Sequence, residues 1–112
     1  MNRNFMQTFS MRCDDPGALV ALAEAWDRQQ AAADIMGYMG SRVLADRDDP
    51  GRYMFIADFG VVDPDVSAVE EAARNNERAE TQAWAAGLLA AIEGTPEYHH
   101  YDELYRTEFY GM

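Results

Sequence analysis

The chain has 112 residues, 48% of them hydrophobic, and a formal net charge of −11 at pH 7. This length and composition are typical of one globular domain spanning residues 1–112, and they exclude a multidomain protein. A negative surface repels phosphates and anionic lipid head groups, so nucleic acid and membranes are not expected partners.

The sequence predicts a cytoplasmic location. The longest apolar run, residues 83–92, is too short to span a bilayer and is interrupted by Gly87. The first ten residues lack the apolar middle of a signal peptide. Cys13 is the only cysteine and has no internal disulfide partner, which fits a reducing compartment.

The first predicted elements are a strand over residues 5–12 and the helix that follows it. Apolar and polar side chains alternate along residues 5–12, as in a half-buried strand. Asp15 is a capping carboxylate immediately before Pro16, which suits the first position of a helix. Apolar residues then recur at helical spacing as far as Trp26. We expect this helix to end near Asp34.

Residues 37–47 and 52–60 both have strand composition and predict a hairpin. Between them, Pro50 presets one backbone dihedral of the turn, and Gly51 supplies the left-handed conformation. The acidic pair Asp48-Asp49 lacks the ligand spacing of a calcium loop, so we assign it to the turn.

A helical region is expected after Asp63-Pro64, where the pattern of a capping residue before a proline recurs. The pair Asn75-Asn76 is predicted to divide this region, because asparagine competes for backbone hydrogen bonds. The second part carries an apolar stripe that includes Trp84 and ends at Gly94. Residues 97–110, rich in tyrosine, predict the last strand.

The order strand, helix, strand, strand, divided helix, strand predicts a ferredoxin-like α+β sandwich. In this fold a four-stranded antiparallel sheet carries both helical segments on one face. The predicted strands hold more large side chains than one helix-covered face is expected to accommodate. An uncovered aromatic face is a liability in a monomer, so the sequence predicts a homodimer with the two sheets face to face. The residues on which this argument rests are Phe5, Phe9, Tyr38, Met39, Tyr53, Phe55, Phe59, Tyr98, Tyr101, Tyr105 and Phe109.

Five segments carry a resemblance to a known family: residues 40–44, 48–55, 58–60, 75–77 and 81–84. With them the chain resembles the dimeric α+β barrel superfamily, and within it the antibiotic biosynthesis monooxygenase-like family. The resemblance spans residues 6–107 and implies a dimeric α+β barrel. The family includes quinone-forming oxygenases, haem-degrading oxygenases and members with no known activity, so the resemblance implies the fold more strongly than the reaction.

The resemblance also implies candidate site residues. Quinone-forming members use neither metal nor flavin, and they place an asparagine and a tryptophan beside a buried aromatic substrate. Asn75, Asn76 and Trp84 are the corresponding candidates here. Asn76 and Trp84 are eight positions apart, about two helical turns, which is wider than the family pair. The haem-degrading branch needs a helical histidine, and neither predicted helical region contains one.

The two histidines, His99 and His100, are adjacent on the last predicted strand, so their side chains point to opposite faces. The one that faces the cavity is a candidate general base, because imidazole titrates near neutral pH. The alternative is a structural histidine bonded to Asp102, Glu103 or a tyrosine. Adjacent strand residues cannot converge on one ion, so no metal site is predicted.

We expect the ligand cavity between the sheet and the divided helical region, with residues 75–84 as one wall. Tyr38, Phe59, Trp84 and Tyr101 are expected to line it and to suit a planar, oxygenated molecule. Arg42 is a candidate for orienting an anionic substrate, its alternative being an ion pair at the surface.

These observations favour a cofactor-independent monooxygenase acting on a small electron-rich aromatic or polyketide-like compound. No nucleophile elbow or glycine-rich phosphate loop is present, so no cofactor is expected and the substrate itself has to reduce dioxygen. Two alternatives remain open, a non-catalytic dimer that binds a small aromatic molecule, and an isomerase or cyclase of the same barrel type.

Overall fold

The computed structural model describes residues 4–33, 37–60 and 67–107. These residues form four strands and three helices in the order that the sequence predicts, with the second helical region divided in two. The elements are β1 (Phe5–Arg12), α1 (Pro16–Ala33), β2 (Tyr38–Ala45), β3 (Arg52–Phe59), α2 (Ala68–Asn76), α3 (Ala79–Ala91) and β4 (Glu93–Asp102).

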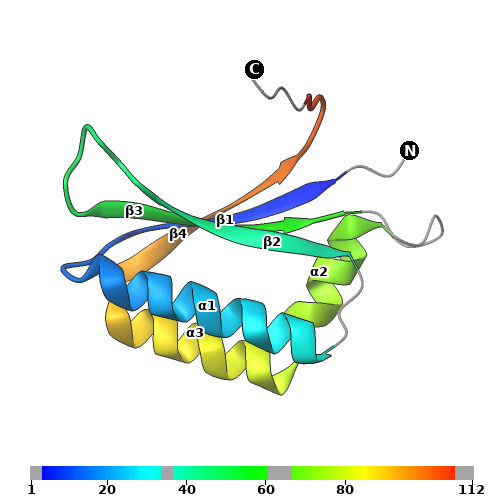
Figure 1. Cartoon of the computed structure of the whole chain (residues 1–112), viewed down its shortest axis with the longest axis horizontal. Helices are drawn as coiled ribbons and strands as arrows, with labels where there is room; N and C mark the ends of the chain where they lie inside the picture. Colours follow the sequence, from blue (N-terminus) through cyan, green and yellow to red (C-terminus); the bar gives the residue numbers. More distant parts are fainter. Residues whose placement is uncertain (1–3, 34–36, 61–66, 108–112) are drawn as a thin grey trace, which may run out of the picture.

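The strands form one antiparallel sheet in the order β2-β3-β1-β4. All three helices lie on one side of this sheet, and the other side carries no helix of the described chain (Figure 1). The predicted ferredoxin-like α+β fold is therefore confirmed. Below, the two sides are called the helix-facing side and the open side.

The core lies between the sheet and the antiparallel pair α1 and α3. The ring centroids of Trp26 on α1 and Trp84 on α3 are 4.8 Å apart, and the ring centroid of Phe55 on β3 lies 5.2 Å from that of Trp84. Phe59 is fully buried. Because side chains of alternating strand residues share a face, β3 contributes every second residue from Phe55 to Phe59 to this core, and β1 contributes Phe5 and Met11.

Two local predictions are confirmed. Gly51 has a φ of +93°, the left-handed conformation expected in the turn between β2 and β3. The helical region is divided as predicted: α2 ends at Asn76, and α3 begins at Ala79.

The predicted start of the second helical region, Asp63-Pro64, lies outside the described residues. The described helix α2 has Ser67 as its cap, and the extended backbone of Ser67 precedes Ala68. The Ser67 hydroxyl accepts a hydrogen bond from the backbone N–H of Glu70, which satisfies one of the free donors at the start of the helix.

The predicted bounds of the last strand, residues 97–110, are wrong. β4 begins at Glu93 and ends at Asp102. β4 lies at the edge of the sheet and pairs only with β1. Phe5, the first residue of β1, is the partner of Asp102, and beyond this pair the backbone N–H of Glu103 donates a hydrogen bond of 2.9 Å to the backbone oxygen of Asn4. Within the described chain Tyr105 lies beyond the strand and is 82% exposed.

The register also corrects the argument for an uncovered aromatic face. Directly opposed residues of antiparallel strands lie on the same face. Phe9, which contacts Trp84 on α3, is opposite Phe55 and Tyr98, so these residues are on the helix-facing side. The same pairing and alternation place Phe5, Phe59, Tyr38 and Tyr53 on that side. The open side carries Tyr101, which is opposite Met6, together with methionine, isoleucine, leucine and polar side chains, so Tyr101 is the one tyrosine or phenylalanine that the described strands place there.

Candidate functional site

Two adjoining cavities lie between the helix-facing side of β1 and β4 and the helices α2 and α3. Their volumes are about 360 and 240 Å³. Gln7, Asn76 and His100 line both cavities, so these three polar residues stand where the two spaces meet. The remaining walls are mainly apolar, which is typical of small-molecule sites. The larger cavity is lined by Val69 and Ala72 and the smaller one by Phe9, Trp84, Leu88 and Tyr98.

The two histidines separate as strand alternation requires. His100 is paired with Gln7 of β1 and faces the helices, and its ring centroid lies 5.5 Å from that of Phe5. His99 is paired with Thr8 and faces the open side. Of the two candidate bases, His100 is therefore the one that lines the cavities.

Gln7 is a site residue that the sequence analysis missed. It is only 5% exposed, and it lines both cavities. Its position was visible in the sequence, because it is the one polar residue on the strand face formed by Phe5, Phe9 and Met11. Its carboxamide borders both cavities, where a bound molecule can exchange hydrogen bonds with it.

The two asparagines of the divided helical region have different surroundings. Asn75 is fully buried, and its side-chain oxygen accepts a hydrogen bond of 3.3 Å from the Thr81 hydroxyl. Asn75 thereby ties the end of α2 to the start of α3 and lines neither cavity. Asn76 follows directly and lines both.

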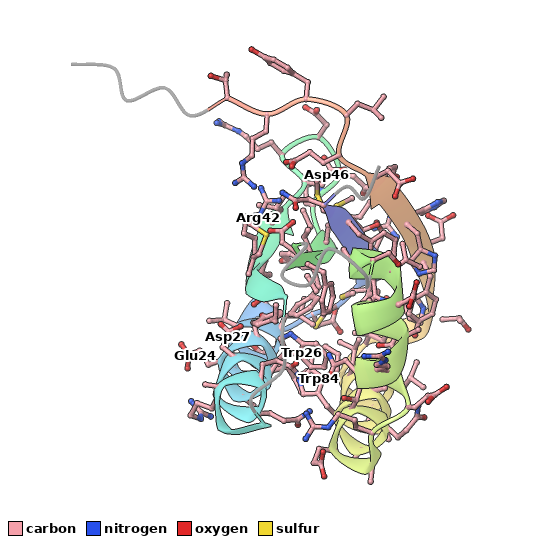
Figure 2. The ribbon with its side chains drawn as sticks, turned by 90° about the vertical axis from the view of Figure 1, so that its right-hand side faces the viewer. Glu24, Trp26, Asp27, Arg42, Asp46 and Trp84 are labelled. Atoms are coloured by element: carbon pink, nitrogen blue, oxygen red, sulfur yellow. The ribbon has the colours of Figure 1, made fainter. Side chains whose placement is uncertain are left out.

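Trp84 forms part of the cavity wall, but its N–H group is already used. The indole Nε1 donates a hydrogen bond of 2.8 Å to the backbone oxygen of Leu22, which joins α3 to α1. Figure 2 shows Trp26 and Trp84 together in the space between these two helices. Trp84 can therefore offer a bound molecule its ring but not its hydrogen-bond donor.

Two of the expected aromatic wall residues, Tyr38 and Phe59, line neither cavity. The Tyr38 hydroxyl donates a hydrogen bond of 2.5 Å to the carboxylate of Asp27 on α1. Partial burial and this hydrogen bond raise the pKa of Tyr38 above its ordinary value. Phe59 packs against the Tyr38 ring, 5.7 Å between centroids, and belongs to the closed core. Tyr101, by contrast, borders the larger cavity.

Arg42 lies on the open side, away from the cavities. Its guanidinium is 3.6 Å from the Asp58 carboxylate, and Figure 2 shows it well apart from the two tryptophans. The cause is a register shift between Tyr38 and Gly40, where Gly40 has a φ of +135°. The extra residue reverses the alternation, so Arg42 and Tyr38 point to opposite sides.

Residues 4–33, 37–60 and 67–107 contain no group of three or more histidine, cysteine, aspartate or glutamate side chains placed to hold a metal ion. None of the helices in these segments is both long and apolar enough to cross a membrane.

Comparison with known proteins identifies the fold. No family model and no curated protein matches the chain, but several solved structures match over nearly its whole length. A candidate antibiotic biosynthesis monooxygenase from Nitrosomonas europaea is 17% identical, with 96% of this chain and 97% of that chain covered and a TM-score of 0.64. A mutant of SnoaB, a cofactor-independent oxygenase from Streptomyces nogalater, is 18% identical, with 93% and 96% covered and a TM-score of 0.64.

A third structure, a candidate antibiotic biosynthesis monooxygenase from Bordetella bronchiseptica, is 19% identical over 93% of this chain and 100% of that chain, with a TM-score of 0.59. The chain therefore shares the ferredoxin-like α+β fold of these antibiotic biosynthesis monooxygenase structures, as its resemblance implies. At these identities the similarity establishes the fold and leaves the reaction to be argued from the site.

Proposed function

We propose that the protein is a cofactor-independent monooxygenase that oxidises a small electron-rich aromatic or polyketide-like compound. The observation that carries this proposal is the meeting of one imidazole, His100, with two carboxamides, Gln7 and Asn76, inside a space walled by aromatic rings. The fold shared with SnoaB supports it.

The first proposed step is removal of a proton by His100. A phenol or an anthrone-like carbon acid lies flat against Phe9 and Trp84 and presents its acidic hydrogen to the imidazole. The negative charge that develops is shared with the oxygen of the substrate. N–H groups of Gln7 and Asn76 donate hydrogen bonds to that oxygen, which lowers the free energy of the anion in a site of low polarity.

Dioxygen then reacts with this anion without another reductant. The anion transfers one electron to dioxygen, and the resulting substrate radical and superoxide combine to form a carbon–oxygen bond. His100 returns the proton to the peroxide formed in this way. For an anthrone, loss of water converts the reacting CH₂ group to a carbonyl, so one oxygen atom enters the product and the other leaves as water.

Oxygen uptake tests the proposal. The protein is incubated with anthrone in air-saturated buffer without added metal or flavin, and oxygen consumption and anthraquinone formation are followed together. We expect one dioxygen consumed for each anthraquinone formed, many times per protein chain and well above the rate of anthrone alone. Binding without added consumption would favour the non-catalytic dimer, and an isomeric product formed without oxygen would favour an isomerase or cyclase.

We also propose that the protein is a homodimer joined through the open side of the sheet. Leu44 on this side is exposed, as are Leu104 and Tyr105 beyond β4, and such residues are commonly covered by a partner. Light scattering at micromolar concentration is expected to give twice the mass of the chain. A monomer under these conditions would contradict the proposal.

A further inference from the structure

We propose that the cavities select uncharged aromatic ligands and reject the corresponding carboxylates. This inference rests on the site of the proposed function and narrows its substrate class. It concerns binding alone, so it can be tested without turnover.

The charge of the cavity walls is the first observation. Every described residue that lines either cavity has an apolar side chain, a neutral polar side chain, an imidazole or a carboxylate. The carboxylate is that of Asp102, two residues after His100 on the same face of β4 and paired with Phe5. The only fixed charge on the described walls is therefore negative.

The position of the arginines outside the described cavity walls is the second observation. Arg42 is paired with Asp58 on the open side, and Arg52 lies 3.4 Å from Glu97. Arg78, at the junction of α2 and α3, is 2.7 Å from Glu80. Neither these arginines nor Arg74 on α2 line the cavities, so the described walls hold no arginine.

These features penalise a ligand that enters the site already charged, unlike the anion of the proposed reaction, which forms beside the imidazolium of His100. A carboxylate that leaves water for the cavity loses its hydration, and Asp102 and the net charge of −11 repel it. An uncharged hydroxyl or carbonyl group loses less hydration free energy, and it can form hydrogen bonds with the amides of Gln7 and Asn76. The walls thus separate two ligands of the same shape by their charge.

Aloe-emodin and rhein test this directly, because the two dihydroxyanthraquinones differ only in a hydroxymethyl or a carboxylate group. Their binding is followed without oxygen by quenching of tryptophan fluorescence at about pH 8, where an ordinary imidazole is neutral and a carboxylate ionised. We expect aloe-emodin to bind at least about tenfold more tightly than rhein. Equal binding, tighter binding of rhein, or no binding of either would overturn the proposal.

Two variants and one control variant test whether this preference for the uncharged ligand arises in these cavities. Val69 lines the larger cavity from α2 and is half-exposed, so Val69→Lys adds an ammonium group there with little disturbance of the core. It is expected to reduce or reverse the preference, while Val69→Met leaves it unchanged. Asp102→Asn should narrow the preference. If Val69→Lys leaves the ratio as in the wild type, the ligand binds elsewhere and the proposal fails.

The outcome is independent of the oxygenase proposal. Charge selection without oxygen uptake on anthrone would leave a neutral-ligand site and remove the oxygenase. Catalytic oxygen uptake with equal binding of the two anthraquinones would leave the oxygenase and remove the selection.

Discussion

The helix-facing side and the open side of the sheet belong to the same four strands but hold different chemistry. On the helix-facing side, the ring centroid of Phe9 lies 5.5 Å from that of Phe55 and 5.0 Å from that of Tyr98. The aromatic rings on this side form part of the core and one wall of the cavities. On the open side, Arg42 and Asp58 pair at the surface. Each strand supplies both environments, because its side chains alternate.

The contrast is sharpest at His99 and His100. These neighbours in sequence lie on opposite sides of the sheet, His99 on the open side and His100 on the helix-facing side. It shows that a single position along a strand decides whether a titratable group can reach a bound molecule. It also explains why Gln7 is informative. A polar residue on an otherwise apolar strand face departs from the local pattern, and such departures concentrate at functional sites.

The largest expected effect separates the two histidines. His100→Gln removes the proposed base and should lower the rate of anthrone oxygenation by about 10²–10⁴-fold, the usual contribution of general base catalysis. His99→Gln is the matched control on the open side and should retain at least half of the wild-type rate. Oxygen uptake measures both. Equal losses in the two variants would mean that the sides do not differ in function.

Stability provides the second contrast. Phe59→Ala on the helix-facing side leaves a cavity where the ring was fully buried, so we expect the free energy of unfolding to fall by about 3–5 kcal/mol. Arg42→Ala on the open side removes an exposed ion pair and should cost less than about 1 kcal/mol. Urea unfolding followed by circular dichroism gives both values. Similar losses would contradict this difference in packing between the two sides of the sheet within the chain.

Gln7→Met is expected to move stability and function in opposite directions. It replaces a buried amide with an apolar side chain of similar volume, so the free energy of unfolding should rise by about 1–2 kcal/mol. Aloe-emodin should bind more weakly, because the ligand loses a hydrogen-bond donor. Thermal unfolding and fluorescence quenching measure the two effects. A variant that is destabilised and still binds normally would assign Gln7 to the structure alone.

Much of the fold could be predicted because local signals agree with it. The proline before α1, the left-handed Gly51 and the Asn75-Asn76 interruption each act within a few residues. The opposite orientation of the two histidines likewise needs only alternation within β4. These features depend on short stretches of chain, and the sequence contains them.

The predictions that proved wrong concern features that depend on pairing with a neighbouring strand. In strict alternation Tyr38 and Arg42 share a face, but the shift at Gly40 places them on opposite sides. Nothing in the sequence of β2 alone fixes that shift, because it arises from pairing with β3. The end of β4 is set in the same way by the first residue of β1. The residues that line the cavities therefore could not be predicted without knowing how the strands pair.

The smallest expected effect concerns Tyr38, on the helix-facing side but outside the cavities. Its pKa is raised in the folded protein, chiefly by burial and then by the hydrogen bond to Asp27. Above its ordinary pKa of 10.0 the unfolded tyrosine loses its proton while the folded one keeps it. The folded state then binds more protons than the unfolded state, so stability is complete below about pH 10 and falls as the pH rises further.

Tyr38→Phe should remove this part of the alkaline loss. At pH 7 the variant lacks one partly exposed hydrogen bond and should be less stable by about 1 kcal/mol or less. As the pH rises from about 9 to 11, the difference between variant and wild type should shrink, because only the wild type loses the contribution of Tyr38. Urea unfolding at a series of pH values measures this difference, and Tyr105→Phe, beyond β4, is the control that should follow the wild type. Parallel stability curves for Tyr38→Phe and the wild type would show that the hydroxyl of Tyr38 ionises alike in the folded and unfolded chain, and that its contact with Asp27 does not hold the proton.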